Sequence, residues 1–76
     1  MTTGITSLPA VHLIDLDPER RVFAPSHGRG WKVTHLVAHD YWHIERADCG
    51  VIDPQDEQGR LIVAACKDFF AQLESR

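Results

Sequence analysis

Three histidines spaced four residues apart form the part of this sequence best suited to chemistry. His35, His39 and His43 lie in a segment rich in aromatic side chains. On an α-helix, this spacing sets the imidazoles in a row with steps of about 6 Å, so that neighbouring rings could share a metal ion. On a β-strand, the same rings would lie roughly 13 Å apart. The row therefore predicts a metal site only if the segment is helical, with zinc as the expected ion because zinc accepts imidazole ligands.

A second interpretation of the same segment is nucleic-acid binding. On a helical wheel, Lys32 and Arg46 fall beside the three histidines, so that one face resembles a small recognition helix followed by a second helix. Only the lysine and the arginine are reliably charged at pH 7, however. The net charge of −3 would also repel a phosphate backbone at longer range. A helix-turn-helix protein is therefore the weaker alternative, and the composition disfavours nucleic acid as a partner.

The aromatic residues of this segment suggest a binding surface for a protein. Trp31 and Trp42 are eleven residues apart, close to three helical turns, and both would flank the histidine row. Tryptophan and tyrosine are enriched among the residues that contribute most to protein–protein binding. The predicted interface comprises Trp31, His35, His39, Tyr41, Trp42, His43 and Arg46.

The loop before this segment is a candidate anion-binding site. If a helix begins just after the loop, its backbone amides and nearby basic side chains would suit a phosphate or a carboxylate. A loop that only needs to turn tightly explains the glycines equally well. The candidate residues are Gly28, Arg29, Gly30 and Lys32.

The secondary-structure elements follow from turn residues and from hydrophobic patterning. Residues 10–24 predict a β-hairpin, because two short runs of β-forming residues flank Asp17-Pro18-Glu19-Arg20, which has typical turn chemistry. Residues 1–9 form a polar, flexible lead-in. Residues 54–74 predict an amphipathic helix with Asp53 as its N-cap and Pro54 in the first helical position. Gly59 weakens that assignment, and a helix that starts near Leu61 is the alternative.

Residues 31–49 fit two structures. As a helix, the segment places Val33, Leu36 and Ile44 on one side and the histidines on another, and Gly50 would end the helix. Its many β-branched and aromatic residues instead favour a second hairpin that turns near His39 and Asp40. The pattern favours the helix narrowly, and the hairpin is the alternative.

Length and composition limit the range of functions. A chain of 76 residues, of which 43% are hydrophobic and 25% charged, has room for one domain with a modest core. The N-terminus lacks a signal-peptide pattern, no apolar run could span a bilayer, and the two cysteines are expected as free thiols. We therefore expect a cytoplasmic protein without a membrane segment.

Together these patterns predict a small single α+β domain over residues 1–76. An N-terminal antiparallel β-hairpin, extended to three or four strands in the alternative, would pack against the amphipathic C-terminal helix. No catalytic signature is present, so we expect a non-enzymatic interaction module that needs no cofactor. It would regulate or inhibit a larger protein partner, or form a homodimer. A protein that binds zinc through His35, His39 and His43 is the first alternative, and the helix-turn-helix protein is the second.

Overall fold

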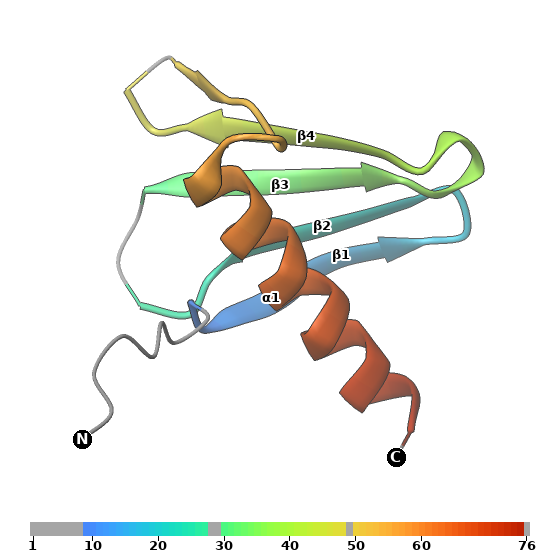
Figure 1. The fold of residues 1–76 in the computed structure, drawn as a ribbon. Coiled ribbons are helices and arrows are strands. Elements are labelled where there is room, and N and C mark those ends of the chain that lie inside the picture. The colour runs from blue at the N-terminus through green and yellow to red at the C-terminus, as the bar shows by residue number, and fades with distance from the viewer. Residues whose placement is uncertain (1–8, 28–29, 49, 76) are drawn as a thin grey trace.

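Five antiparallel strands form one sheet, and a single C-terminal helix packs on it (Figure 1). The computed structural model describes residues 9–27, 30–48 and 50–75. The strands lie side by side in chain order. This arrangement confirms the predicted α+β domain, although the sheet is larger than the expected hairpin and than the three or four strands of the alternative. Residues 1–8 of the expected lead-in lie outside the described residues. The elements are β1 (Val11–Asp17), β2 (Arg20–Pro25), β3 (Trp31–Leu36), β4 (Tyr41–Arg46), β5 (Val51–Ile52) and α1 (Glu57–Glu74).

Both hairpin turns at one end of the sheet are stabilised by local hydrogen bonds. Between β1 and β2, the carboxylate of Asp17 accepts the backbone N–H of Glu19 at 3.0 Å, as the turn chemistry of this segment predicts. Between β3 and β4, a single 3₁₀ turn (Val37–His39) ends at Asp40, which has a left-handed backbone with φ 48°. The N–H of Val37 donates to the carbonyl of Glu19 at 3.0 Å, so the two turns also support each other.

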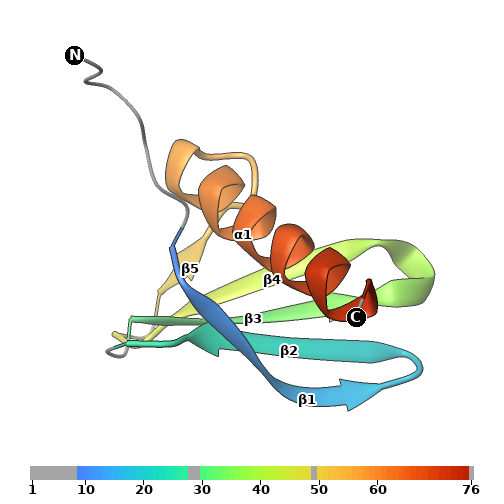
Figure 2. The same cartoon turned by 90° about the horizontal axis from the view of Figure 1, so that it is seen from below.

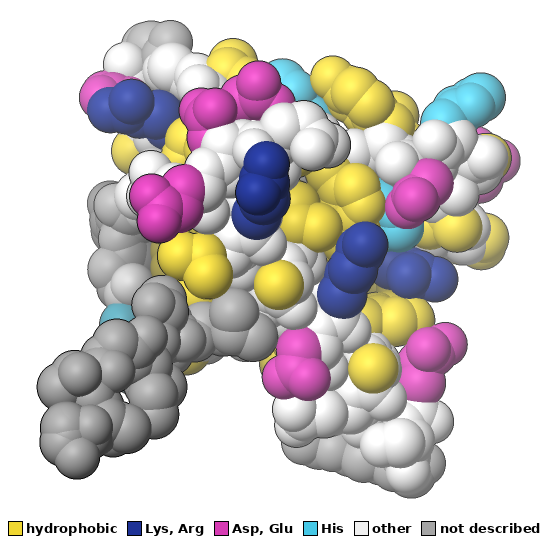
Figure 3. All heavy atoms as spheres, viewed as in Figure 1, with side chains coloured by type: hydrophobic (Ala, Val, Ile, Leu, Met, Phe, Trp, Pro, Cys, Tyr) yellow, Lys and Arg dark blue, Asp and Glu magenta, His cyan; other side chains and the backbone are white. Residues whose placement is uncertain are grey.

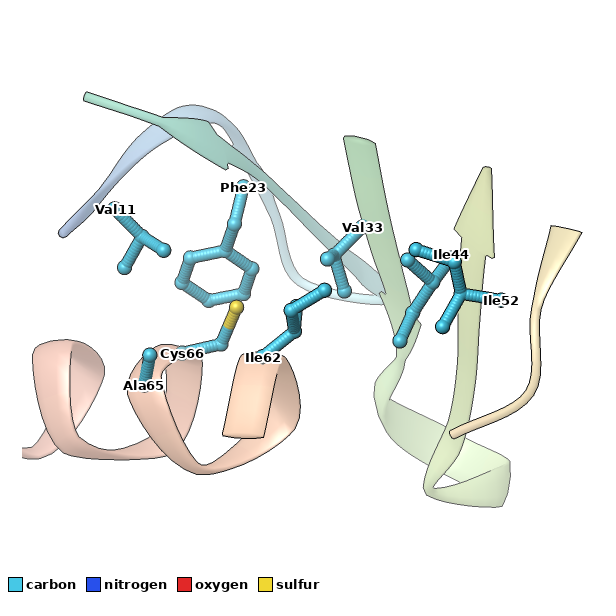
Figure 4. Packing of buried hydrophobic residues seen from close by; sticks show 8 residues of the cluster. All are labelled: Val11, Phe23, Val33, Ile44, Ile52, Ile62, Ala65 and Cys66. Carbon is cyan, nitrogen blue, oxygen red and sulfur yellow. The ribbon is translucent and has the colours of Figure 1, made fainter. Parts of the chain in front are cut away.

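The two faces of the sheet differ because side chains alternate along each strand. The face under α1 forms the core, to which all five strands contribute (Figure 4). Phe23, Val33 and Ile44 are fully buried there, and side chains of this size each contribute about 1.5–3 kcal/mol to folding. The core cluster comprises Val11, Phe23, Val33, Ile44, Ile52, Ile62, Ala65 and Cys66.

The opposite face of the sheet, which we call the open face, is not covered by another element of the described chain (Figure 2). Its members follow from strand alternation and from the cross-strand pairs, because paired residues share a face. The open face consists of His12, Asp15, Asp17, Arg20, Val22, Ala24, Lys32, Thr34, Leu36, Tyr41, His43, Glu45 and Val51.

The helix begins at Glu57 and not at Pro54, because Asp53 caps a turn instead of the helix. The Asp53 carboxylate accepts the N–H of Gln55 at 2.9 Å, and its carbonyl accepts the N–H of Asp56 at 2.9 Å. This turn folds back over the first helical turn and lies directly against Gly59, which is buried. Gly59 therefore lies inside the helix, and the alternative start near Leu61 is also wrong.

The helix favoured for residues 31–49 is wrong, and the alternative hairpin is correct. Trp31, Val33 and His35 point toward α1, whereas Lys32 and Thr34 point to the open face. The side chains therefore alternate with a period of two, as the many β-branched and aromatic residues favour. The strands are preferred over an amphipathic helix because β3 and β4 each gain two hydrogen-bonded neighbours in the sheet.

Candidate functional site

The hairpin separates the three histidines that suggested a metal site. His35 points to the core side of the sheet, His39 lies in the exposed 3₁₀ turn, and His43 lies on the open face. Among the residues that the structure describes, no three His, Cys, Asp or Glu side chains are grouped so that they could hold a metal ion. The predicted zinc site is therefore wrong, since it depended on a helix. The recognition helix of the second alternative is missing for the same reason.

His35 is the polar residue buried at the edge of the core. Its side chain is only 9% exposed and stacks on Trp42, with ring centroids 3.9 Å apart and planes 11° from parallel. Its Nε2 lies 2.9 Å from Oδ1 of Asp40. A carboxylate can only accept, so Nε2 carries the hydrogen and donates it. His35 therefore holds Trp42 against the core and binds the residue that ends the β3–β4 turn.

The hydrogen bond from His35 lowers the pKa of Asp40 below the ordinary value of 3.8 for aspartate. Desolvation, the second-largest effect, raises this pKa, whereas the Coulombic interaction with His35, a hydrogen bond from Trp42 and the charge of Lys67 lower it further. Asp40 itself is exposed, with 77% of its side chain accessible. The residue therefore favours the ionised form and completes the turn with a left-handed backbone that aspartate tolerates.

A small cleft of about 160 Å³ separates this His35–Asp40–Trp42 group from the C-terminal half of α1. Arg21 lies over the ring of Phe70, 3.8 Å from its centroid, and the Nζ of Lys67 lies 5.9 Å from the centroid of Trp42. Figure 3 shows hydrophobic, basic, acidic and histidine side chains mixed on the face that bears α1. The cleft is smaller than the roughly 300 Å³ typical of a ligand pocket, and two of its own cations lie over its aromatic rings.

Cys66 lines the same cleft as His35, and a cysteine beside a histidine is an arrangement that nucleophilic enzymes use. Burial raises the pKa of the Cys66 thiol to about 12, whereas a nucleophilic cysteine needs a lowered pKa. The second nitrogen of His35, Nδ1, is buried and has no hydrogen-bond partner among the described residues. A general base needs a nitrogen within reach of its substrate. The observed geometry therefore suits a structural role for both side chains.

The remaining predicted interface residues fall on both sides of the sheet. Trp31 packs against the core, and Arg46 forms an exposed ion pair with Asp48 at 2.8 Å. Tyr41 and His43 lie together on the open face, with ring centroids 6.5 Å apart. The structure thus divides the predicted interface into a core-facing group and an open-face group.

The predicted anion loop is described only in part. Gly28 and Arg29 lie outside the described residues. Gly30 and Lys32 line a shallow hollow of about 430 Å³ at the end of the sheet. Lys32 lies opposite Glu45 in the register of β3 and β4, so an acidic neighbour offsets its charge. The hollow extends onto the open face.

Three apolar open-face residues were not predicted as part of an interface. Val22 is almost fully buried in its centre, whereas Leu36 and Val51 are exposed, Val51 by 64%. Strand alternation through Lys32, Thr34 and Leu36 was the signal that could have found them, but the helical interpretation placed Leu36 in the core. With Ala24 and with Tyr41, which is 53% exposed, they are the apolar and aromatic carbon-rich residues of the open face besides its histidines.

No family model, curated protein or solved structure matches this chain. In the part of the chain that the structure describes, no helix is long and apolar enough to cross a membrane.

Proposed function

We propose that this protein is a non-enzymatic interaction module that binds a protein partner through the open face of its sheet. One observation carries the proposal. The helix covers one face of the five-stranded sheet, whereas the other face exposes Leu36, Tyr41 and Val51 and has no covering element in the described chain. Tyrosine is enriched among the residues that contribute most to protein–protein binding, and the buried centre of an interface is more apolar than the rest of the surface.

The edges of the sheet are less suitable for binding than its face. At one edge, β1 carries a register shift between Leu13 and Asp15, and a bulge of this kind disrupts pairing with an added strand. Two carboxylates, those of Asp15 and Asp17, lie on the same strand. At the other edge, β5 has only two residues. A bulged, acidic edge strand and a very short edge strand both disfavour pairing of the sheet with a strand of another chain.

The charge of the open face favours a protein over a nucleic acid. Arg20 is paired with Asp15 at 3.2 Å, and Lys32 lies opposite Glu45. Opposite charges therefore offset one another locally, whereas nucleic-acid binding depends on unopposed lysine and arginine. The net charge of −3 points in the same direction.

A matched pair of substitutions tests the proposal. Leu36 on the open face and Leu73 on α1 are both 36% exposed, so Leu36→Lys and Leu73→Lys make the same chemical change on opposite layers. We expect partner capture from the native host to be lost with Leu36→Lys and retained with Leu73→Lys. Equal capture by both variants would remove the open face from the function. Circular dichroism melting curves check that both variants fold.

A further inference from the structure

We infer that the open face is covered by a second copy of this chain, so that two sheets pack face to face between two outer helices. The inference rests on the proposed function and names the partner. It follows from the charge pattern of the open face, from its apolar content and from its area. The charge pattern argues against a nucleic acid or a strongly charged protein, the apolar content provides surface for a second copy to bury, and the area determines how strong the contact can be.

The charge pattern suits a surface that meets itself. In a twofold dimer, the same patch is present on both subunits, so a patch of a single sign would repel its copy. The open face instead pairs Arg20 with Asp15 and Lys32 with Glu45, and Asp17, the register partner of Arg20, is the remaining carboxylate. A basic or acidic partner would require the opposite pattern, a face with one predominant sign.

The open face has apolar surface that a second copy of the chain would bury. Leu36 and Tyr41 are cross-strand partners, so they form one continuous apolar contact at the end of the sheet near both hairpin turns. Val22 lies one row further in and is already buried by its neighbours. A domain of this size buries only about 60% of its unfolded surface and is marginally stable alone. Covering the open face would therefore stabilise the fold by mass action.

The area sets the expected strength of the dimer. Four strands of about six residues, at roughly 4.8 Å between strands and 3.3 Å per residue, give about 400 Å² of flat surface per copy. Two copies would bury about 800 Å², which is below the roughly 1,200 Å² of stable interfaces. We therefore expect a weak dimer that forms as the protein concentration rises, with a dissociation constant in the high micromolar range.

Sedimentation equilibrium of the purified full chain tests the inference. From about 10 μM to about 1 mM, the apparent mass should rise from the monomer value of 8.6 kDa toward twice that value. Leu36→Lys, and independently Tyr41→Lys, should weaken this association by at least about tenfold. Leu73→Lys should behave as the wild type. Tyr41 serves as the second site because its exposure leaves the fold little changed by substitution.

Two results would overturn the inference. One is a mass of 8.6 kDa at every concentration, and the other is a dimer that both open-face variants leave intact. If the chain stays monomeric while capture of a different protein still depends on Leu36, the second copy is wrong and the interaction function stands. If neither association nor capture depends on Leu36, both proposals fail.

Discussion

Replacing Gly59 by alanine should destabilise the protein, although alanine is the better helix former. In an exposed helix, the exchange would stabilise the fold by about 1 kcal/mol. Here an added Cβ would meet the backbone carbonyl of Asp53 directly, and would lie 2.8 Å from the Cα of Pro54 and 2.9 Å from the carbonyl carbon of Asp53. These atoms are backbone, so they cannot move aside as the end of a flexible side chain would.

The loss of stability can be worked out from the backbone atoms that must move to make room for the added Cβ. Overpacking costs about 1–3 kcal/mol. The obstructing carbonyl also accepts the N–H of Asp56, the residue before the helix, and the loss of that hydrogen bond costs about 1 kcal/mol more. After the helical gain is subtracted, we expect Gly59→Ala to lower the free energy of unfolding by about 2 kcal/mol. For a domain of this size, the melting temperature should fall by roughly 8–16 °C.

Thermal and urea unfolding, followed by circular dichroism, measure this effect. Gly30→Ala is the control, because a Cβ built there has no neighbour within 4 Å in the described part of the chain. It should leave stability unchanged or raise it by a few tenths of a kcal/mol. A Gly59→Ala protein as stable as the wild type would show that the turn at residues 53–54 does not lie against the helix as described.

Two further predictions concern ionisable groups. Because the pKa of Asp40 is lowered, its contribution to stability is complete above pH 3.8 and is lost as the pH falls below that value. Acid unfolding of Asp40→Asn should therefore depend less on pH in this range than that of the wild type, and parallel curves would contradict the bond to His35. Because the pKa of Cys66 is raised from 9.0 to about 12, stability should fall as the pH rises above 9, by about 1.4 kcal/mol per pH unit. In a Cys49→Ser background, a thiol reagent should modify Cys66 only as fast as the chain unfolds, and reaction at the rate of a free thiol would show that it is accessible.

Local chemistry was sufficient to predict the N-terminal hairpin and the C-terminal helix. Asp17 and Pro18 specify a turn by themselves, and the apolar face from Ile62 to Leu73 specifies a helix by its period. The start of that helix was not predictable in the same way. Asp53 and Pro54 have typical helix-start chemistry, but they form a turn whose position depends on close contact with Gly59. This contact joins residues that sequence propensities treat as independent.

The middle segment was assigned to a helix wrongly because a spacing of four residues fits both periods. Four is close to the 3.6 residues of a helical turn and is also twice the strand period. The choice depends on partners distant in sequence, since Val33 pairs with Phe23 on one side and Ile44 on the other. The predicted interface was consequently split, because the turn between His35 and His43 places them on opposite faces.

This turn also connects the buried histidine to the proposed binding surface. A shift of one residue in a strand would exchange its buried and exposed side chains. On β4, such a shift would move Tyr41 and His43 into the core and Trp42 out of it. The stacking of His35 on Trp42 favours the observed register because it requires Trp42 to lie opposite His35. The bond from His35 to Asp40 fixes the turn that leads into β4. The polar group at the core edge thus helps to determine which residues the open face presents to a partner.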